Sequence, residues 1–174
     1  MDKKTTALLI GCSSVAVLMF LLLAGGLLML GMAAQNGWLA PIDPVKGEDL
    51  PDTSRQKIAK IVELRPDEEI LYFYSSGFTI EEDGNLFTNQ RVISYQSDEA
   101  TYVYEADYEE IEDIQMVAAT DWLDFETIEI TVEDGDYFNL YIDTTEASGK
   151  EFPKELLKNW NAKKKTATEE SVAD

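Results

Sequence analysis

Histidine is absent from the 174-residue chain, and cysteine occurs once, at Cys12. Without histidine there is no usual general base, no histidine-dependent nucleophile pair and no histidine-ligated metal. A single cysteine forms no internal disulfide and supplies too little of a four-ligand zinc site. Cations are scarce as well, with 14 Lys and Arg against 34 Asp and Glu and a net charge of −20. A nucleic-acid binder needs a basic surface to neutralise phosphates, so this class is excluded too.

One long stretch near the N-terminus, residues 7–34, carries no charged side chain. A helix of ~20 apolar residues crosses a ~30 Å hydrocarbon core, so this stretch predicts an uncleaved transmembrane helix after a short basic segment at 1–6. A cleaved signal peptide is the first alternative, but its apolar core runs to only ~7–15 residues. A lipid-modified Cys12 is the second, but the apolar run continues far beyond it. We interpret Cys12 as a small apolar residue of the helix.

The charges that flank this stretch favour one orientation. Lys3, Lys4 and the terminal amine precede it, whereas Lys46 is the only cation in residues 35–54. The positive-inside rule then predicts a single-pass membrane protein with its N-terminus in the cytoplasm and its C-terminal domain outside. A domain that faces the cytoplasm is the alternative.

Three shorter segments flank the predicted domain. Residues 35–52 contain three prolines and predict an extended linker. In it, Trp38 is interpreted as an aromatic anchor at the membrane interface, with packing onto the domain as the alternative. Residues 53–64 predict a short helix with one apolar stripe. Residues 163–174 show no periodicity and predict a disordered tail.

Between these segments the hydrophobic pattern has a period of two. Residues 127–132 and 137–142 alternate strictly and are joined by Asp134-Gly135, which indicates a β-hairpin. Further short runs of this kind bring the number of strands to about seven. A helix follows, with an apolar face formed by Phe152, Leu156 and Trp160. The pattern predicts an all-β barrel or sandwich of about seven antiparallel strands, closed by a C-terminal helix, over residues 65–162.

The segment that runs from Gly84 to Tyr95, with the sequence GNLFTNQRVISY, resembles a known hairpin motif. It is similar to that of bacterial pleckstrin-homology-like (GRAM/YokE-type) domains, with Gly84, Thr88, Asn89 and Arg91 at the matching positions. The resemblance covers roughly residues 64–162 and implies a pleckstrin-homology fold of two near-orthogonal sheets and a capping helix. The fold serves lipid binding, peptide binding and assembly, so the resemblance does not settle function.

Arg91 is the only cation between residues 66 and 149, against 23 carboxylates. Phosphoinositide recognition needs several Lys or Arg side chains, so binding of these lipids is not expected. An anion contact is one reading of Arg91. We favour the other, an internal ion pair with a nearby carboxylate.

Carboxylates are the only chemical groups present in number. Adjacent pairs are inevitable among 34 acidic residues, and the spacing around Gly84 and Gly135 fails the EF-hand pattern for calcium. No catalytic residue, cofactor site or metal site is predicted, and the chain is not expected to be an enzyme. A ligand or cation sensor that uses the acidic surface is the alternative function, and a carboxylate hydrolase is less favoured.

All eight tyrosines lie between residues 72 and 141. Strand propensity alone accounts for such a pattern, but tyrosine is also enriched at binding hot spots. The functional hypothesis is a domain for protein–protein interaction or assembly, with another membrane or membrane-associated protein as partner. The candidate partner surface consists of Tyr72, Tyr74, Tyr102, Tyr104, Tyr137 and Tyr141.

Overall fold

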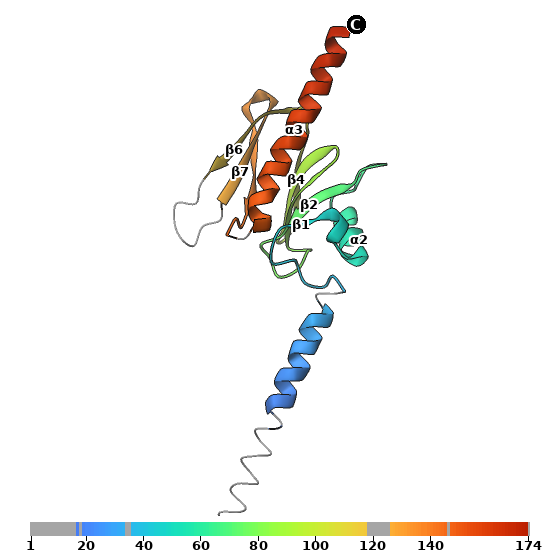
Figure 1. The fold of residues 1–174 in the computed structure, drawn as a ribbon, viewed down its shortest axis with the longest axis vertical. Coiled ribbons are helices and arrows are strands. Elements are labelled where there is room, and N and C mark those ends of the chain that lie inside the picture. Colours follow the sequence, from blue (N-terminus) through green and yellow to red (C-terminus); the bar gives the residue numbers. More distant parts are fainter. Residues whose placement is uncertain (1–16, 18, 34–35, 118–125, 146, 174) are drawn as a thin grey trace, which may run out of the picture.

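Two antiparallel sheets and a C-terminal helix form the body of the protein in the computed structural model (Figure 1). The structure describes residues 17, 19–33, 36–117, 126–145 and 147–173. The first sheet has the strand order β1-β2-β3-β4-β5 and the second the order β6-β7-β8. The elements are β1 (Val45–Lys46), α2 (Asp52–Ile61), β2 (Ile70–Tyr74), β3 (Asp83–Thr88), β4 (Arg91–Ser97), β5 (Thr101–Asp107), β6 (Ile111–Val117), β7 (Glu126–Val132), β8 (Tyr137–Ile142) and α3 (Ala147–Ala173), with 3₁₀ turns at Gly47–Asp49 and Glu133–Gly135.

The strands β2 to β8 with α3 make up a pleckstrin-homology-like arrangement, which confirms the predicted all-β domain. Each sheet follows the chain order by antiparallel pairing, as short turns between strands require. The predicted hairpin at Asp134-Gly135 joins β7 to β8, and Gly135 adopts a positive φ of 80°. Strand β1 was not predicted, and it pairs with β2 at the edge of the first sheet.

The main core lies between the two sheets and α3. Alternation places Ile128 and Ile130 of β7 on the inner face, where both are 0% exposed. The predicted apolar face of α3 packs into the same cluster, and Phe152 meets the Tyr72 and Phe87 rings edge-on, with centroids 5.8 and 5.0 Å apart. The C-terminal helix therefore closes the domain as expected.

A second core covers the opposite face of the first sheet. Ile58 of α2 is 0% exposed and packs in a cluster with Leu50 and Phe73. The prediction of a linker at 35–52 is therefore corrected, because this segment contributes β1 and buries Leu50. Apolar residues separated by prolines look like a linker locally, but here they supply the cover that the sheet face needs.

The C-terminal tail also differs from the prediction. Residues 163–174 were expected to be disordered, whereas α3 continues to Ala173. The segment contains no glycine or proline and many lysine, alanine and glutamate residues, which are good helix formers. It extends a helix that the domain has already nucleated (Figure 1).

The predicted transmembrane helix is the main correction. Residues 19–33 are helical. Over the described ranges, no helix combines the length and the apolar character that crossing a membrane requires. The single-pass localisation and the orientation drawn from Lys3 and Lys4 are overturned with it. Residues 1–16, 18 and 34, Cys12 among them, lie outside the described residues.

Candidate functional site

Arg91 lies at the start of β4 in an internal ion pair, as the sequence predicted. Its side chain is 3% exposed and that of Glu68 is 0% exposed. The guanidinium binds the carboxylate with two contacts, Nε to Oε1 at 2.8 Å and Nη2 to Oε2 at 3.0 Å. Nη1 contacts Glu105 of β5, and Nη2 also donates to the carbonyl oxygens of Val62 at 3.1 Å and Glu63 at 3.3 Å.

The Glu68 carboxylate has further donors. The Thr88 hydroxyl donates to Oε1 at 2.8 Å and the Arg65 amide to Oε2 at 2.8 Å. Burial raises the pKa of Glu68, but the Arg91 guanidinium and these hydrogen bonds outweigh it, and the pKa lies below its usual value. The Arg91 guanidinium is therefore engaged by protein groups. Its role is to join the chain after α2 to β4 and β5.

The other residues of the hairpin motif have structural roles as well. A Cβ added at Gly84 would lie 2.4 Å from the Tyr95 ring, so the ring requires glycine opposite it. The Asn89 side chain accepts from the Glu69 amide at 2.9 Å and donates to the Asp67 carbonyl at 3.0 Å. The motif thus specifies the β3–β4 hairpin and its junction with β2.

The six candidate tyrosines separate into a buried group and an exposed group. Tyr72 and Tyr74 of β2 are 6% and 3% exposed and belong to the main core. Burial, followed by the nearby charge of Asp143, raises the pKa of Tyr74 to about 12. These two tyrosines are too deeply buried to form an exposed partner surface, so their place in the predicted surface is corrected.

The other four tyrosines are exposed. Tyr102 and Tyr104 lie on β5, the edge strand of the first sheet, and are 58% and 54% exposed. Tyr104 stacks on Phe138 of β8 with the ring centroids 6.5 Å apart. Tyr137 and Tyr141 lie on the opposite face of β8 from Phe138 and are 63% and 47% exposed.

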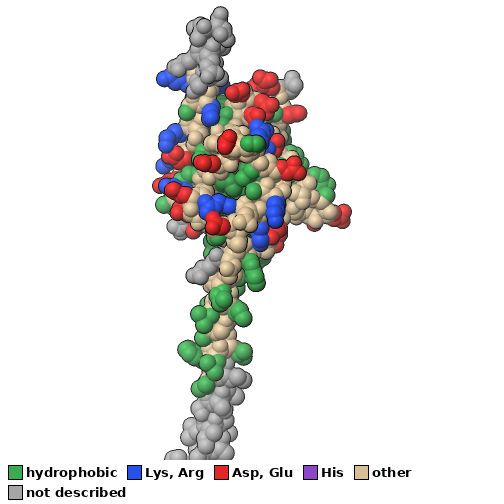
Figure 2. Space-filling view, turned by 90° about the vertical axis from the view of Figure 1, so that its right-hand side faces the viewer, with side chains coloured by type: hydrophobic (Ala, Val, Ile, Leu, Met, Phe, Trp, Pro, Cys, Tyr) green, Lys and Arg blue, Asp and Glu red, His purple; other side chains and the backbone are tan. Residues whose placement is uncertain are grey.

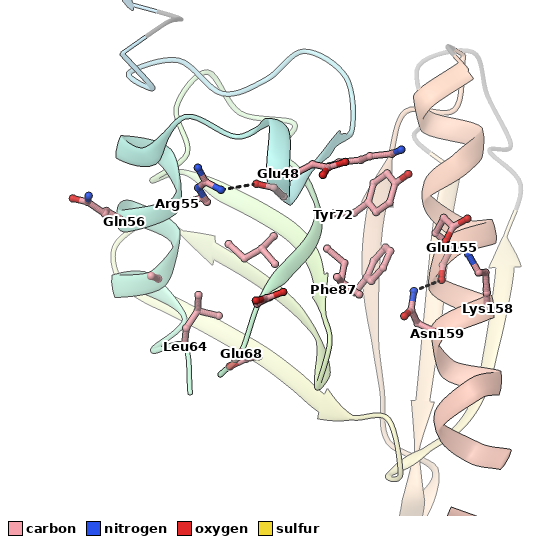
Figure 3. Close-up of a pocket in the computed structure, with 16 residues that line it drawn as sticks. Glu48, Arg55, Gln56, Leu64, Glu68, Tyr72, Phe87, Glu155, Lys158 and Asn159 are labelled. Atoms are coloured by element: carbon pink, nitrogen blue, oxygen red, sulfur yellow. Dashed lines mark hydrogen bonds and ion pairs between the residues drawn. The ribbon is translucent and has the colours of Figure 1, made fainter. Parts of the chain in front are cut away.

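An open groove of about 810 Å³ lies between α2 and α3 (Figure 3). Its lining combines apolar side chains, among them Ile70, Leu71 and Phe87, with charged groups. The charged residues that line it are Lys46, Glu48, Arg55, Glu68, Glu69, Glu155 and Lys158. Figure 2 shows apolar side chains exposed among acidic and basic ones on this side of the molecule. The groove has the character of a site for a ligand with an apolar body and a polar end.

Sequence reasoning missed the groove because its lining comes from segments far apart in the chain, from Lys46 to Asn159. No local motif connects them. Trp38, predicted as an interfacial anchor, is 64% exposed and follows the helix at 19–33. Within the part of the chain that the structure describes, no group of three or more acidic or cysteine side chains is placed to hold a metal ion.

Comparisons with known proteins add little. No family model matches the chain, and no curated protein matches it. A crystal structure of a DUF1696 family protein with a pleckstrin-homology domain from Shewanella loihica PV-4 is similar, with 14% identity and a TM-score of 0.47. The match covers 69% of this chain and 94% of that one. The assignment of the fold therefore depends on the strand order and the capping helix described above.

Proposed function

We propose that this pleckstrin-homology-like domain acts in protein–protein interaction or assembly through the exposed tyrosines of β5 and β8. The observation that carries the proposal is the exposure of Tyr102 and Tyr104, 58% and 54%, on a strand at the edge of its sheet. An exposed tyrosine that becomes buried on binding is a frequent anchor of protein interfaces, because its ring supplies contact area and its hydroxyl group a polar contact. The finer assignment to GRAM/YokE-type domains stays a prediction.

The charge around this surface favours a protein over an anionic lipid. Glu105 and Asp107 of β5 carry carboxylates, and their cation partners, Arg91 and Arg65, are held in ion pairs. Anionic phosphates would meet repulsion from a chain of charge −20. A protein surface, in contrast, can match the tyrosines with apolar and polar groups.

Site-specific photocrosslinking tests the proposal. A photoreactive phenylalanine analogue replaces Tyr102 in the full-length protein in cells, and in a control it replaces Phe78, which is 84% exposed. We expect a discrete light-dependent adduct from position 102 and none from position 78. Equal adduct formation at the two positions, or none at either, would refute an interaction specific to β5.

A second candidate function, a ligand sensor, is favoured by the groove. The probe is 1-anilinonaphthalene-8-sulfonate, which has an apolar body and an anionic end. Ala59 of α2 lines the groove, whereas Lys60 is exposed and does not line it. We expect Ala59→Trp to weaken probe binding severalfold and Lys60→Trp to leave it unchanged. Identical binding to both variants would exclude the groove as the site.

A further inference from the structure

The outer edge of β5 has the properties of a strand that accepts another strand. β5 is the last strand of its sheet, and all five residues from Thr101 to Glu105 are exposed. Edge strands in natural proteins are usually protected by a lysine, a proline or a bulge. The register of β5 with β4 is continuous from Thr101 to Asp107, and this stretch contains neither lysine nor proline.

The hydrogen bonds at the end of β5 show which backbone groups point outward. The Asp107 amide donates to the Glu110 side chain at 3.0 Å, and the Tyr108 amide donates to the Gln90 carbonyl beside β4 at 3.4 Å. Backbone groups of an antiparallel strand alternate in direction. Counting back in steps of two from Asp107, the N–H and C=O groups of Glu105, Val103 and Thr101 point away from β4.

We propose that β5 pairs antiparallel with β5 of a second copy of this chain, about a two-fold axis at Val103. In this register Val103 faces its symmetry mate and exchanges both backbone hydrogen bonds with it. Thr101 then lies opposite Glu105 of the other copy, and the pairing forms about six interchain hydrogen bonds. The proposal rests on the proposed function and names its partner.

The side chains of β5 match this symmetry. Tyr102 and Tyr104 lie one residue on either side of Val103, so each Tyr102 faces a Tyr104 of the other copy. Directly opposed aromatic side chains stabilise antiparallel pairs by about 0.2–1 kcal/mol each. Both tyrosines lie on the sheet face that carries the Tyr104–Phe138 stack, so the four rings extend an existing aromatic contact.

Internal ion pairs reduce the repulsion that this strongly acidic chain meets when two β5 strands pair. Arg65 Nη1 holds the Asp107 carboxylate at 2.7 and 2.9 Å, and Arg91 contacts Glu105. Each carboxylate of the paired strand is therefore held by an arginine of its own copy, although Arg91 is shared with Glu68 and one negative charge remains in the set. The remaining repulsion between two copies of charge −20 is long-range and is screened by salt. Added salt should strengthen the dimer, whereas it would weaken the binding of a basic peptide to the same edge.

The buried area predicts a weak dimer. Two tyrosines that are each about half exposed, with Val103 between them, bury roughly 200–300 Å² per copy. The total lies below the ~1,200–2,000 Å² of stable complexes. Association should therefore depend on concentration.

The first test removes one outward backbone donor. In the full-length protein, Val103→Pro deletes the N–H that points away from β4, so the ladder within the sheet is preserved. Val103→Thr is the matched control, since it keeps the N–H and a β-branched side chain. Sedimentation velocity over a range of protein concentrations measures the dimer. We expect the proline variant to lose at least tenfold in association and the threonine variant to dimerise like the wild type. Dimerisation equal in all three proteins overturns the proposal.

The second test measures the register of the two β5 strands by disulfide formation. It remains informative if the proline variant unfolds. With Cys12→Ser as background, Val103→Cys places two thiols on the axis. Thr101→Cys places them about 13 Å apart, because residue 101 lies opposite residue 105. Mild oxidation should link the first variant at least tenfold faster. Equal rates, or no link at 103, overturn the pairing. If the pairing is overturned but photocrosslinking at Tyr102 captures another protein, the proposed function stands and only self-pairing fails. If photocrosslinking captures nothing, the proposed function and self-pairing both fail.

Discussion

Replacing Glu68 by glutamine tests whether the buried ion pair stabilises the fold. Glu68→Gln keeps the shape of the side chain and removes its charge, which leaves the Arg91 guanidinium, 3% exposed, without its main counterion. The Thr88 hydroxyl and the Arg65 amide lose a charged acceptor at the same time. The perturbation therefore acts on one closed set of contacts.

Its magnitude follows from burial. Removing one partner of a buried ion pair costs about 3–5 kcal/mol, because the other charge stays buried without compensation. Glu105 still contacts the guanidinium, and its side chain is 39% exposed, so we expect the lower end, about 3 kcal/mol. Replacing both Glu68 and Arg91 by methionine should recover part of this loss, since no buried charge is left without a partner and Glu105, which loses Arg91, is 39% exposed.

Urea unfolding followed by circular dichroism measures the change in the free energy of unfolding. Glu69→Gln is the control, because Glu69 is exposed, and its effect should stay within about 0.5 kcal/mol. A loss below about 1 kcal/mol for Glu68→Gln, or a double variant less stable than the single one, would refute the reasoning.

The pH dependence provides an independent check of the same pair. The folded-state pKa of Glu68 lies below its ordinary value of 4.5, so the unfolded chain binds the proton more readily in this range. The stabilisation is complete above pH 4.5 and is lost as the pH falls through the lower folded-state value. Wild type and Glu68→Gln should therefore converge in stability as the pH is lowered from 5 towards 2.

Three further predictions concern the cores. Gly84→Ala should lower stability by about 1–3 kcal/mol in the same urea assay, because the added methyl group meets the fixed Tyr95 ring; an unchanged midpoint would contradict the close approach. Ile58→Ala should cost about 2–5 kcal/mol if α2 is part of the folded unit, and a loss below about 1 kcal/mol would show that α2 is a separate appendage. The raised pKa of Tyr74, about 12, should make stability fall as the pH rises from 10 to 12, and Tyr74→Phe should reduce that fall, as thermal melts at both pH values would show.

The strands and the closing helix were predictable because their signals are local. Period-two alternation over residues 127–132 and 137–142 predicts one buried face whatever the rest of the chain does. The four-residue spacing of Phe152, Leu156 and Trp160 does the same for α3. The ion pair of Arg91 could be expected from the scarcity of cations around it, although its partner Glu68 could not be named.

The errors have different physical causes. Residues 35–52 look like a linker, since no local rule says that the outer face of the first sheet needs a cover. Composition alone predicts a membrane span over residues 7–34, whereas no helix among the described residues is long and apolar enough to cross a membrane. The tail at 163–174 shows no periodicity and predicts disorder, yet it continues the helix α3, whose other end packs against the sheets.

Composition and pattern settle a good deal about this protein. They argue against nucleic acid and anionic phospholipid as ligands, and they predict the antiparallel domain and its helix. They do not distinguish the buried tyrosines from the exposed ones. Alternation shows which residues share a strand face, but not whether other parts of the chain cover that face. Folding buries Tyr72 and Tyr74 in the main core and leaves Tyr102 and Tyr104 at an open edge. Whether a side chain can meet a partner depends on contacts between distant segments, and the groove and the β5 edge arise from such contacts.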